Sequence, residues 1–158
     1  MAIDYSRLTN DASAAEILEA ASKLKTKKEK IELLQKYGNR ADFMYVLRGA
    51  YAPNIEWLVP DGPLPEGVLP SAAVSIDTAE DRLIRAYRQF QYLVKGGPDV
   101  RQAKREEIYL NMYRSLHNSE AQLLHSIVNK KLPYKGISKA LVAEAFPQVW
   151  PKESKAKS

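Results

Sequence analysis

Thr26-Lys27-Lys28-Glu29 fits the capping-box pattern, in which a hydroxyl and a carboxylate three residues later each accept a hydrogen bond from the other residue's backbone N–H. Ser13-Ala14-Ala15-Glu16 fits the same pattern nearer the N-terminus. The earlier box predicts a helix through about Leu24. The later box predicts a helix that turns Leu34 inward and ends at Gly38 in a left-handed cap. The sequence therefore predicts two helix N-termini near the beginning of the chain.

The rest of the chain repeats apolar residues at spacings of three and four, the period of a buried helix face. Strand-like alternation never extends beyond a few positions. We expect five further helices, namely one capped by Asn39, one that follows Thr78-Ala79-Glu80-Asp81 and ends at Gly96-Gly97-Pro98, one capped by Asp99, one capped by Asn118 or Ser119, and a short one capped by Ser138. The predicted fold class is all-α, with about seven helices.

A single compact helical domain is expected over residues 1–150, because a chain of 158 residues has the size of one domain. Its N-terminal helices would span residues 12–58 and its basic C-terminal helices residues 78–150. Between them, six prolines and glycines within eleven positions exclude a helix. Residues 59–77 are therefore predicted to form a long Pro/Gly-rich connector on the surface, and residues 151–158 a basic disordered tail.

Several classes of chemistry lack the residues that they need. The chain has no cysteine, and its two histidines, His117 and His125, are eight residues apart, which excludes thiolate sites and a histidine metal cage. It has no glycine-rich phosphate loop and no nucleophile elbow. It also lacks a secretory signal and the roughly 18–20 apolar residues of a membrane span. We expect a soluble, non-enzymatic protein without catalytic residues, metal, cofactor, membrane contact or small-molecule substrate.

Positive charge is concentrated in the second half of the chain. Residues 1–79 hold 9 Lys and Arg against 11 Asp and Glu, a net charge of −2, whereas residues 80–158 hold 15 against 8, a net charge of +7. This asymmetry favours an acidic partner, with nucleic acid as the first candidate. The alternative is a basic surface that only keeps the protein in solution.

The most specific basic stretch is Lys130-Lys131-Leu132-Pro133-Tyr134-Lys135-Gly136-Ile137-Ser138. Gly136 permits a close backbone approach, and Ser138 can cap a helix whose free N–H groups would bind a backbone phosphate. An ordinary capped turn between packed helices is the alternative. Tyr134 could pack on sugars or bases, whereas Tyr87 is assigned to the core. The residues predicted to contact DNA, which we expect to converge on one groove, are Arg101, Lys104, Arg105, Lys130, Lys131, Lys135, Gly136, Ser138 and Lys139.

The order of these features resembles the N-terminal helical DNA-binding domain of phage-type ATP-dependent DNA ligases. That domain has a Thr-Lys-x-x-Lys helix ending in paired leucines, then Tyr-Asp-Pro, then a leucine-rich helix, Asp-Leu-x-x-Gly-Val-Ser, a short helix and a proline. The counterparts here are Thr26-Lys27-Lys28-Glu29-Lys30 with Leu33-Leu34, Tyr51-Ala52-Pro53, Leu123-Leu124, the stretch 131–138, and Phe146-Pro147. The likeness spans roughly residues 15–150. It departs from the family at Ala52 and Lys131, where the family has acidic residues, and in a Leu-to-Gly spacing that is one residue longer.

The resemblance implies a domain that grips duplex DNA across the minor groove through backbone contacts. The ligases' catalysis belongs to a separate domain with a Lys-x-Asp-Gly motif, and Asp61-Gly62 here follows Val59 at the position of that lysine. The chain also looks similar to small stand-alone proteins of tailed phages, including cyanophages and T4-like phages. We therefore predict a phage protein that binds double-stranded DNA with little sequence preference in the cytoplasm of the infected host cell.

A second hypothesis treats the same scaffold as a phage protein-interaction adaptor or a virion-associated protein. The Pro-rich connector would then be the docking surface for a phage or host protein, with Trp57 beside it and Trp150 near the tail.

Overall fold

A computed structural model describes residues 12–52, 55–59, 64–132 and 134–147 of the chain. Its α-helices are α1 (Ala14–Ser22), α2 (Lys27–Lys36), α3 (Ala41–Tyr51), α4 (Leu83–Ala86), α5 (Gln102–Ser115), α6 (Asn118–Val128) and α7 (Lys139–Ala145). Two short 3-10 helices, η2 (Ile76–Thr78) and η3 (Tyr87–Tyr92), accompany them. Extended pairing within the described residues is limited to isolated bridges between Trp57 and Val94 and between Asp81 and Leu116. The all-α class predicted from the sequence is confirmed.

Both capping boxes form as predicted. Glu16 N donates to Ser13 Oγ at 3.1 Å, and Ser13 N donates to Glu16 Oε1 at 2.9 Å. At the start of α2, Glu29 N donates to Thr26 Oγ1 at 3.1 Å, and Thr26 N donates to Glu29 Oε1 at 3.2 Å. A capping box involves only residues within one helical turn, so its prediction does not depend on the rest of the fold.

Three other predicted caps are wrong by one or two positions. The residues that precede α3, α5 and α6 are Arg40, Arg101 and His117, in place of the predicted Asn39, Asp99 and Asn118 or Ser119. The start of α3 shows a tertiary reason. The Arg40 guanidinium pairs with the buried carboxylate of Asp42 and also donates to the carbonyl of Ala12, so contacts across the fold set where α3 begins.

The predicted left-handed cap at Gly38 is also wrong. Tyr37 is the C-cap of α2, and Gly38 does not have a positive φ. Glycine is needed there for space, because a Cβ atom on Gly38 would lie 2.9 Å from Cε1 of Phe146. This close approach brings the end of α7 against the end of α2.

The single long helix expected before Gly96 is divided into two shorter ones. α4 ends at Ala86 and the chain tightens into η3. Leu58 N donates to Leu93 O at 2.7 Å, and Lys95 N donates to Glu56 O at 2.9 Å, so backbone groups after η3 bond to a neighbouring segment instead of continuing a helix. Phe90 is nevertheless buried, as the apolar spacing predicted, and Leu93, which the predicted face did not include, is buried as well.

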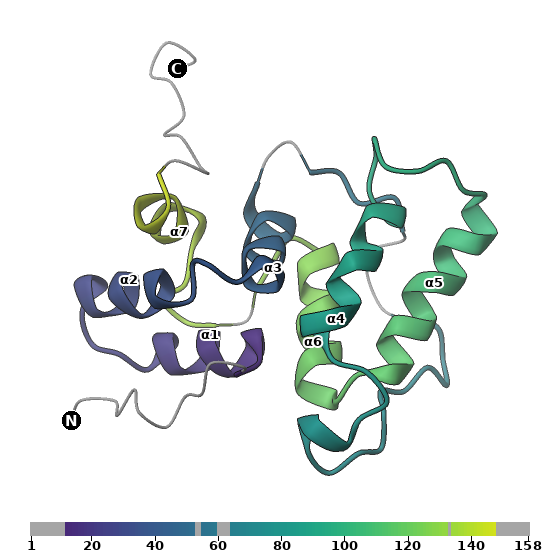
Figure 1. Ribbon diagram of the computed structural model, residues 1–158, viewed down its shortest axis with the longest axis horizontal. Coiled ribbons are helices and arrows are strands. Elements are labelled where there is room, and N and C mark those ends of the chain that lie inside the picture. The colour runs from purple at the N-terminus through teal and green to yellow at the C-terminus, as the bar shows by residue number, and fades with distance from the viewer. Residues whose placement is uncertain (1–11, 53–54, 60–63, 133, 148–158) are drawn as a thin grey trace.

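Figure 1 shows α3 near the middle of the molecule, with α1, α2 and α7 on one side and α4, α5 and α6 on the other. The last helix, α7, packs against α2, while α6 packs against α1 and α3. The first and second halves of the chain are therefore interleaved around one core. Its fully buried side chains come from both halves and include Ile17, Leu34, Phe43, Leu47, Leu83, Leu116, Leu124 and Ile127.

The Pro-rich connector was predicted to lie on the surface from Val59 onward, but Val59 is buried in the core. The described residues 64–77 lie on the outside of this core. Leu69 is 70% exposed and Val74 is 96% exposed. One backbone contact, from Ser71 N to Leu116 O at 2.9 Å, holds the connector against the end of α5. Within the described residues, no helix has the length and apolar character needed to cross a membrane. The predicted tail at 151–158 lies outside these residues.

Candidate nucleic-acid interface

The segment that joins α6 to α7 contains six of the nine residues predicted to contact DNA, and we call residues 130–139 the lysine segment. It begins with a Schellman motif at the end of α6. Lys130 N donates to Ile127 O at 2.9 Å, and Lys131 N donates to Ser126 O at 3.0 Å. Lys130 occupies the left-handed position of this motif with a φ of 59°, where glycine is usual. A side chain there costs about 1–2 kcal/mol, so the backbone alone would favour a different residue.

The side chain of Lys130 joins two helix ends. Its Nζ donates to the carbonyl oxygen of Ala52 at 2.9 Å, which ties the end of α6 to the end of α3. Burial lowers the pKa of Lys130, and the positive charge of Lys139 lowers this pKa further. The charge at the far end of the lysine segment thus adds to the effect of burial on Lys130.

Gly136 forms a turn in the lysine segment beside Lys30 of α2. Its φ is 81°, and a Cβ atom at this position would lie 3.0 Å from Cε of Lys30. Lys30 was not predicted as a site residue. Its Nζ donates to the carbonyl oxygens of Ala21, Ser22 and Leu24, so it covers the C-terminal end of α1. Sequence reasoning missed this lysine because it is far from Gly136 along the chain and lies in the half with a net negative charge.

Two tyrosines fix the path of the lysine segment. The hydroxyl of Tyr51, at the end of α3, donates to the carbonyl oxygen of Ile137 at 3.2 Å. Tyr134 packs against the core, and burial raises its pKa to about 12, with a further contribution from the negative charge of Glu19. Tyr134 therefore supports the segment from within. Tyr87 also packs against the core, as predicted.

Like Lys130, the other cations of the lysine segment are exposed. They are Lys131, Lys135 and Lys139. Among the described residues, no acidic side chain pairs with Lys131 or Lys135. Ser138 is exposed too, and its hydroxyl accepts the N–H of Leu141 at 3.2 Å, so it forms the predicted cap of α7. The segment therefore offers ammonium groups to an anion, while its serine hydroxyl is engaged by its own helix.

The three predicted residues of α5 have different surroundings. Arg101 is exposed and precedes the helix, and Lys104 pairs with Glu107 at 3.4 Å. Arg105 is half-buried, and its guanidinium donates to the carbonyl oxygen of Tyr92 at 3.0 Å and to Gln102 Oε1 at 2.8 Å. Arg105 therefore holds α5 against η3, and the exposed cations at this end are Arg101 and Lys104.

The structure divides the nine predicted residues into two groups and does not bring them to one groove. In Figure 1, which has the longest axis horizontal, α7 and the start of α5 lie toward opposite ends of the molecule. The lysine segment returns to α1, α2 and α3, whereas α5 packs against η3 and α6. The division follows from this packing, which charge counting along the sequence does not reveal.

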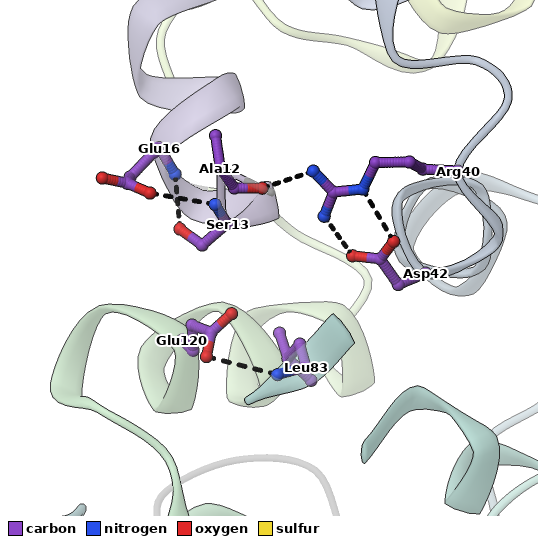
Figure 2. A network of polar contacts seen from close by, with 7 residues as sticks. All are labelled: Ala12, Ser13, Glu16, Arg40, Asp42, Leu83 and Glu120. Atoms are coloured by element: carbon purple, nitrogen blue, oxygen red, sulfur yellow. Dashed lines mark hydrogen bonds and ion pairs between the residues drawn. The ribbon is translucent and has the colours of Figure 1, made fainter. Parts of the chain in front are cut away.

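A separate group of charged residues is buried between the helices. Arg40 holds Asp42 in a two-bonded ion pair, with Nη2–Oδ2 and Nε–Oδ1 distances of 2.6 and 3.0 Å (Figure 2). Glu120 is only 1% exposed, and its Oε1 accepts the N–H of Leu83 at 3.2 Å. Its Oε2 has no hydrogen-bond partner among the described residues. Burial raises the pKa of Glu120 to about 7, while the Leu83 N–H and the charge of Arg82 act in the opposite direction.

This buried group is structural, since it has no exposed member through which a ligand could enter. The described His, Asp and Glu residues also include no cluster of three or more that could hold a metal ion. Trp57, which the adaptor hypothesis places beside the docking connector, is half-buried. Its Nε1 donates to the carbonyl oxygen of Gly49 at 2.9 Å, and its ring meets the Phe90 ring edge-on with centroids 5.4 Å apart. Trp150 lies outside the described residues.

Comparison with protein families gives one match. Residues 17–134 match a family of unknown function, DUF6433. The chain belongs to the DUF6433 family. The matched region runs from α1 into the lysine segment and includes Lys130 and Lys131, whereas Lys135 and Lys139 follow it. No curated protein and no solved structure matches the chain. The likeness to ligase DNA-binding domains and the phage origin stay predictions.

Proposed function

We propose that this DUF6433 protein is a non-enzymatic DNA-binding protein that contacts the phosphates of duplex DNA through the lysine segment. The observation that carries the proposal is the grouping of four ammonium groups in ten residues on one edge of the fold, with Lys131 and Lys135 unpaired among the described residues. Phosphate contacts of this kind carry little base specificity. The proposed setting is the cytoplasm of an infected host cell.

The salt dependence of binding measures how many cations contact the DNA. Four phosphate contacts lower the affinity about a hundredfold between 50 and 200 mM salt, whereas six contacts, with Arg101 and Lys104 included, lower it on the order of a thousandfold. We expect the smaller factor, since the α5 group lies at the other end of the molecule. Fluorescence anisotropy of a labelled duplex at several salt concentrations gives the slope. Absence of binding at 50 mM salt, or binding that ignores salt, contradicts the proposal.

A pair of double variants locates the contact. Lys135→Ala with Lys139→Ala is expected to weaken duplex binding about tenfold at 100 mM salt, because two phosphate contacts are lost. Arg101→Ala with Lys104→Ala removes the same charge from the start of α5 and is expected to leave binding nearly unchanged. Both pairs are exposed, so the melting temperature should stay within about 2 °C of the parent. Equal weakening by the two double variants would show that the lysine segment is not the contact.

The adaptor hypothesis retains one supporting observation, the exposure of Leu69 and Val74 in the Pro-rich connector. Exposed aliphatic side chains in a connector can serve as contacts for a protein partner. Leu69→Ser with Val74→Ser should then abolish the capture of a partner that survives nuclease treatment, without changing DNA binding. A partner whose capture is unaffected by this double variant does not use the connector.

A further inference from the structure

Two cavities lie beside α3. The larger, about 660 Å³, lies between α3 and the ends of α2 and α7, and its lining includes Asn39, Tyr45, Arg48 and Phe146. The smaller, about 360 Å³, lies between α3 and η3, and its lining includes Ala52, Trp57 and Phe90. Tyr45 and Arg48 line both cavities and so stand between them. Both cavities are in the size range of small-ligand sites.

The side chains between the cavities are suited to a flat, negatively charged group. Tyr45 is 43% exposed, and the edge-on contact with Tyr87, at 5.0 Å between ring centroids, holds its ring in place. The side chain of Arg48 is exposed and makes no hydrogen bond or ion pair with the described residues. No acidic residue is among the described residues that line either cavity. An aromatic face beside an unpaired guanidinium is the combination that binds a base and its phosphate in single-stranded nucleic acid.

The smaller cavity meets the lysine segment at Ala52. Ala52 lines the cavity, and its carbonyl oxygen accepts the hydrogen bond from Lys130 Nζ at 2.9 Å. Ala52 therefore connects the wall of this cavity to the lysine segment. We propose that Tyr45 and Arg48 form a site for an unpaired nucleobase and its phosphate, next to the phosphate contacts. This inference rests on the proposed function and predicts that the protein prefers DNA with unpaired bases over intact duplex.

The experiment compares a twelve-nucleotide thymidine strand with an abasic strand of the same length, which keeps the phosphates and lacks the bases. At 50 mM salt we expect the thymidine strand to bind about tenfold more tightly, since base stacking on an aromatic side chain has this magnitude. Tyr45→Ala should reduce the affinity for the thymidine strand to that for the abasic strand, whereas Tyr45→Phe, which keeps the ring, should preserve the difference. Equal affinities for the two strands, or a difference that survives in Tyr45→Ala, overturns the inference.

The lysine variants separate this inference from the proposed function. Lys135→Ala with Lys139→Ala should weaken binding of both strands by the same factor and keep their ratio. If no strand and no duplex binds, the proposed function fails, and thymidine monophosphate at millimolar concentration tests the cavities alone. With Trp150→Phe as background, Trp57 is the remaining tryptophan and lines the smaller cavity. Quenching of its fluorescence that Tyr45→Ala abolishes supports a nucleotide site, and absence of quenching overturns it.

Discussion

Two tyrosines one turn apart on α5 illustrate how the same side chain can have different effects on stability. Tyr113 and Tyr109 are both buried. The hydroxyl oxygen of Tyr113 accepts a hydrogen bond from Gln122 Nε2 at 2.8 Å. The hydroxyl of Tyr109 has no partner among the described residues, and burial raises its pKa above the ordinary value of 10. A buried hydroxyl without a partner loses its hydration and gains nothing in return.

We therefore expect opposite results from one substitution at these two positions. Tyr113→Phe should lower the free energy of unfolding by about 1 kcal/mol, because a hydrogen bond is lost and Gln122 loses an acceptor. Tyr109→Phe should leave it unchanged or raise it by up to about 1 kcal/mol, because only an unsatisfied group is removed. Urea unfolding of the two variants and the parent measures both changes in the free energy of unfolding. A loss in Tyr109→Phe as large as that in Tyr113→Phe would indicate a partner for the Tyr109 hydroxyl.

At the level of the elements, the capping boxes are the most independent units of the structure. The side chains of Thr26 and Glu29 accept each other's backbone N–H groups at the start of α2. Thr26→Ala should lower the free energy of unfolding by about 1 kcal/mol, since the helix loses the acceptor for the N–H of its third residue. Ser22→Ala is the control, because its hydroxyl donates to the carbonyl of Glu19 and caps no N–H group. An equal loss in both variants contradicts the capping role of Thr26.

Element boundaries could be predicted from the sequence where a local interaction sets them. The boxes at Ser13 and Thr26 and the cap at Ser138 are such cases. The start of α3 and the change from α4 to η3 could not be predicted, because they depend on the contact of Arg40 with the carbonyl of Ala12 and on backbone bonds from residues 56 and 58 to the end of η3. The partners in these contacts are distant along the chain, and at α3 the sequence also offers Asn39 as a local cap.

For the molecule as a whole, the buried Glu120 connects stability to pH. It faces Arg82, and the carboxylates of Asp42 and Glu16 add to the effect of burial in raising its pKa to about 7. Since its ordinary pKa is 4.5, the folded state binds this proton more tightly than the unfolded chain. The resulting stabilisation is fully present below pH 4.5 and is lost as the pH rises through 7. Above that pH the fold contains a buried carboxylate that is incompletely paired.

Glu120→Gln tests this linkage, because the amide keeps the acceptor for Leu83 N–H and cannot ionise. The free energy of unfolding of the variant, relative to the parent, should increase between pH 4.5 and 7.5 by about 3 kcal/mol and then level off. Urea unfolding at several pH values measures the difference. Glu107→Gln, at an exposed position, is the control. A difference for Glu120→Gln that does not change with pH shows that Glu120 keeps the same proton in both states.

The sequence by itself determined that the chain is helical, that apolar residues at helical spacing face a core, and where the two capping boxes lie, because these properties depend on helix period and on contacts within one turn. It also indicated the lysine segment as a basic turn that leads into a capped helix. Only the tertiary structure decided that α7 returns to α2, that Lys30 lies beside Gly136, and that the α5 cations are at the other end of the molecule. The cavities beside Tyr45 and Arg48 also depend on the tertiary structure, because they are formed by helices that are distant in sequence and leave no local pattern.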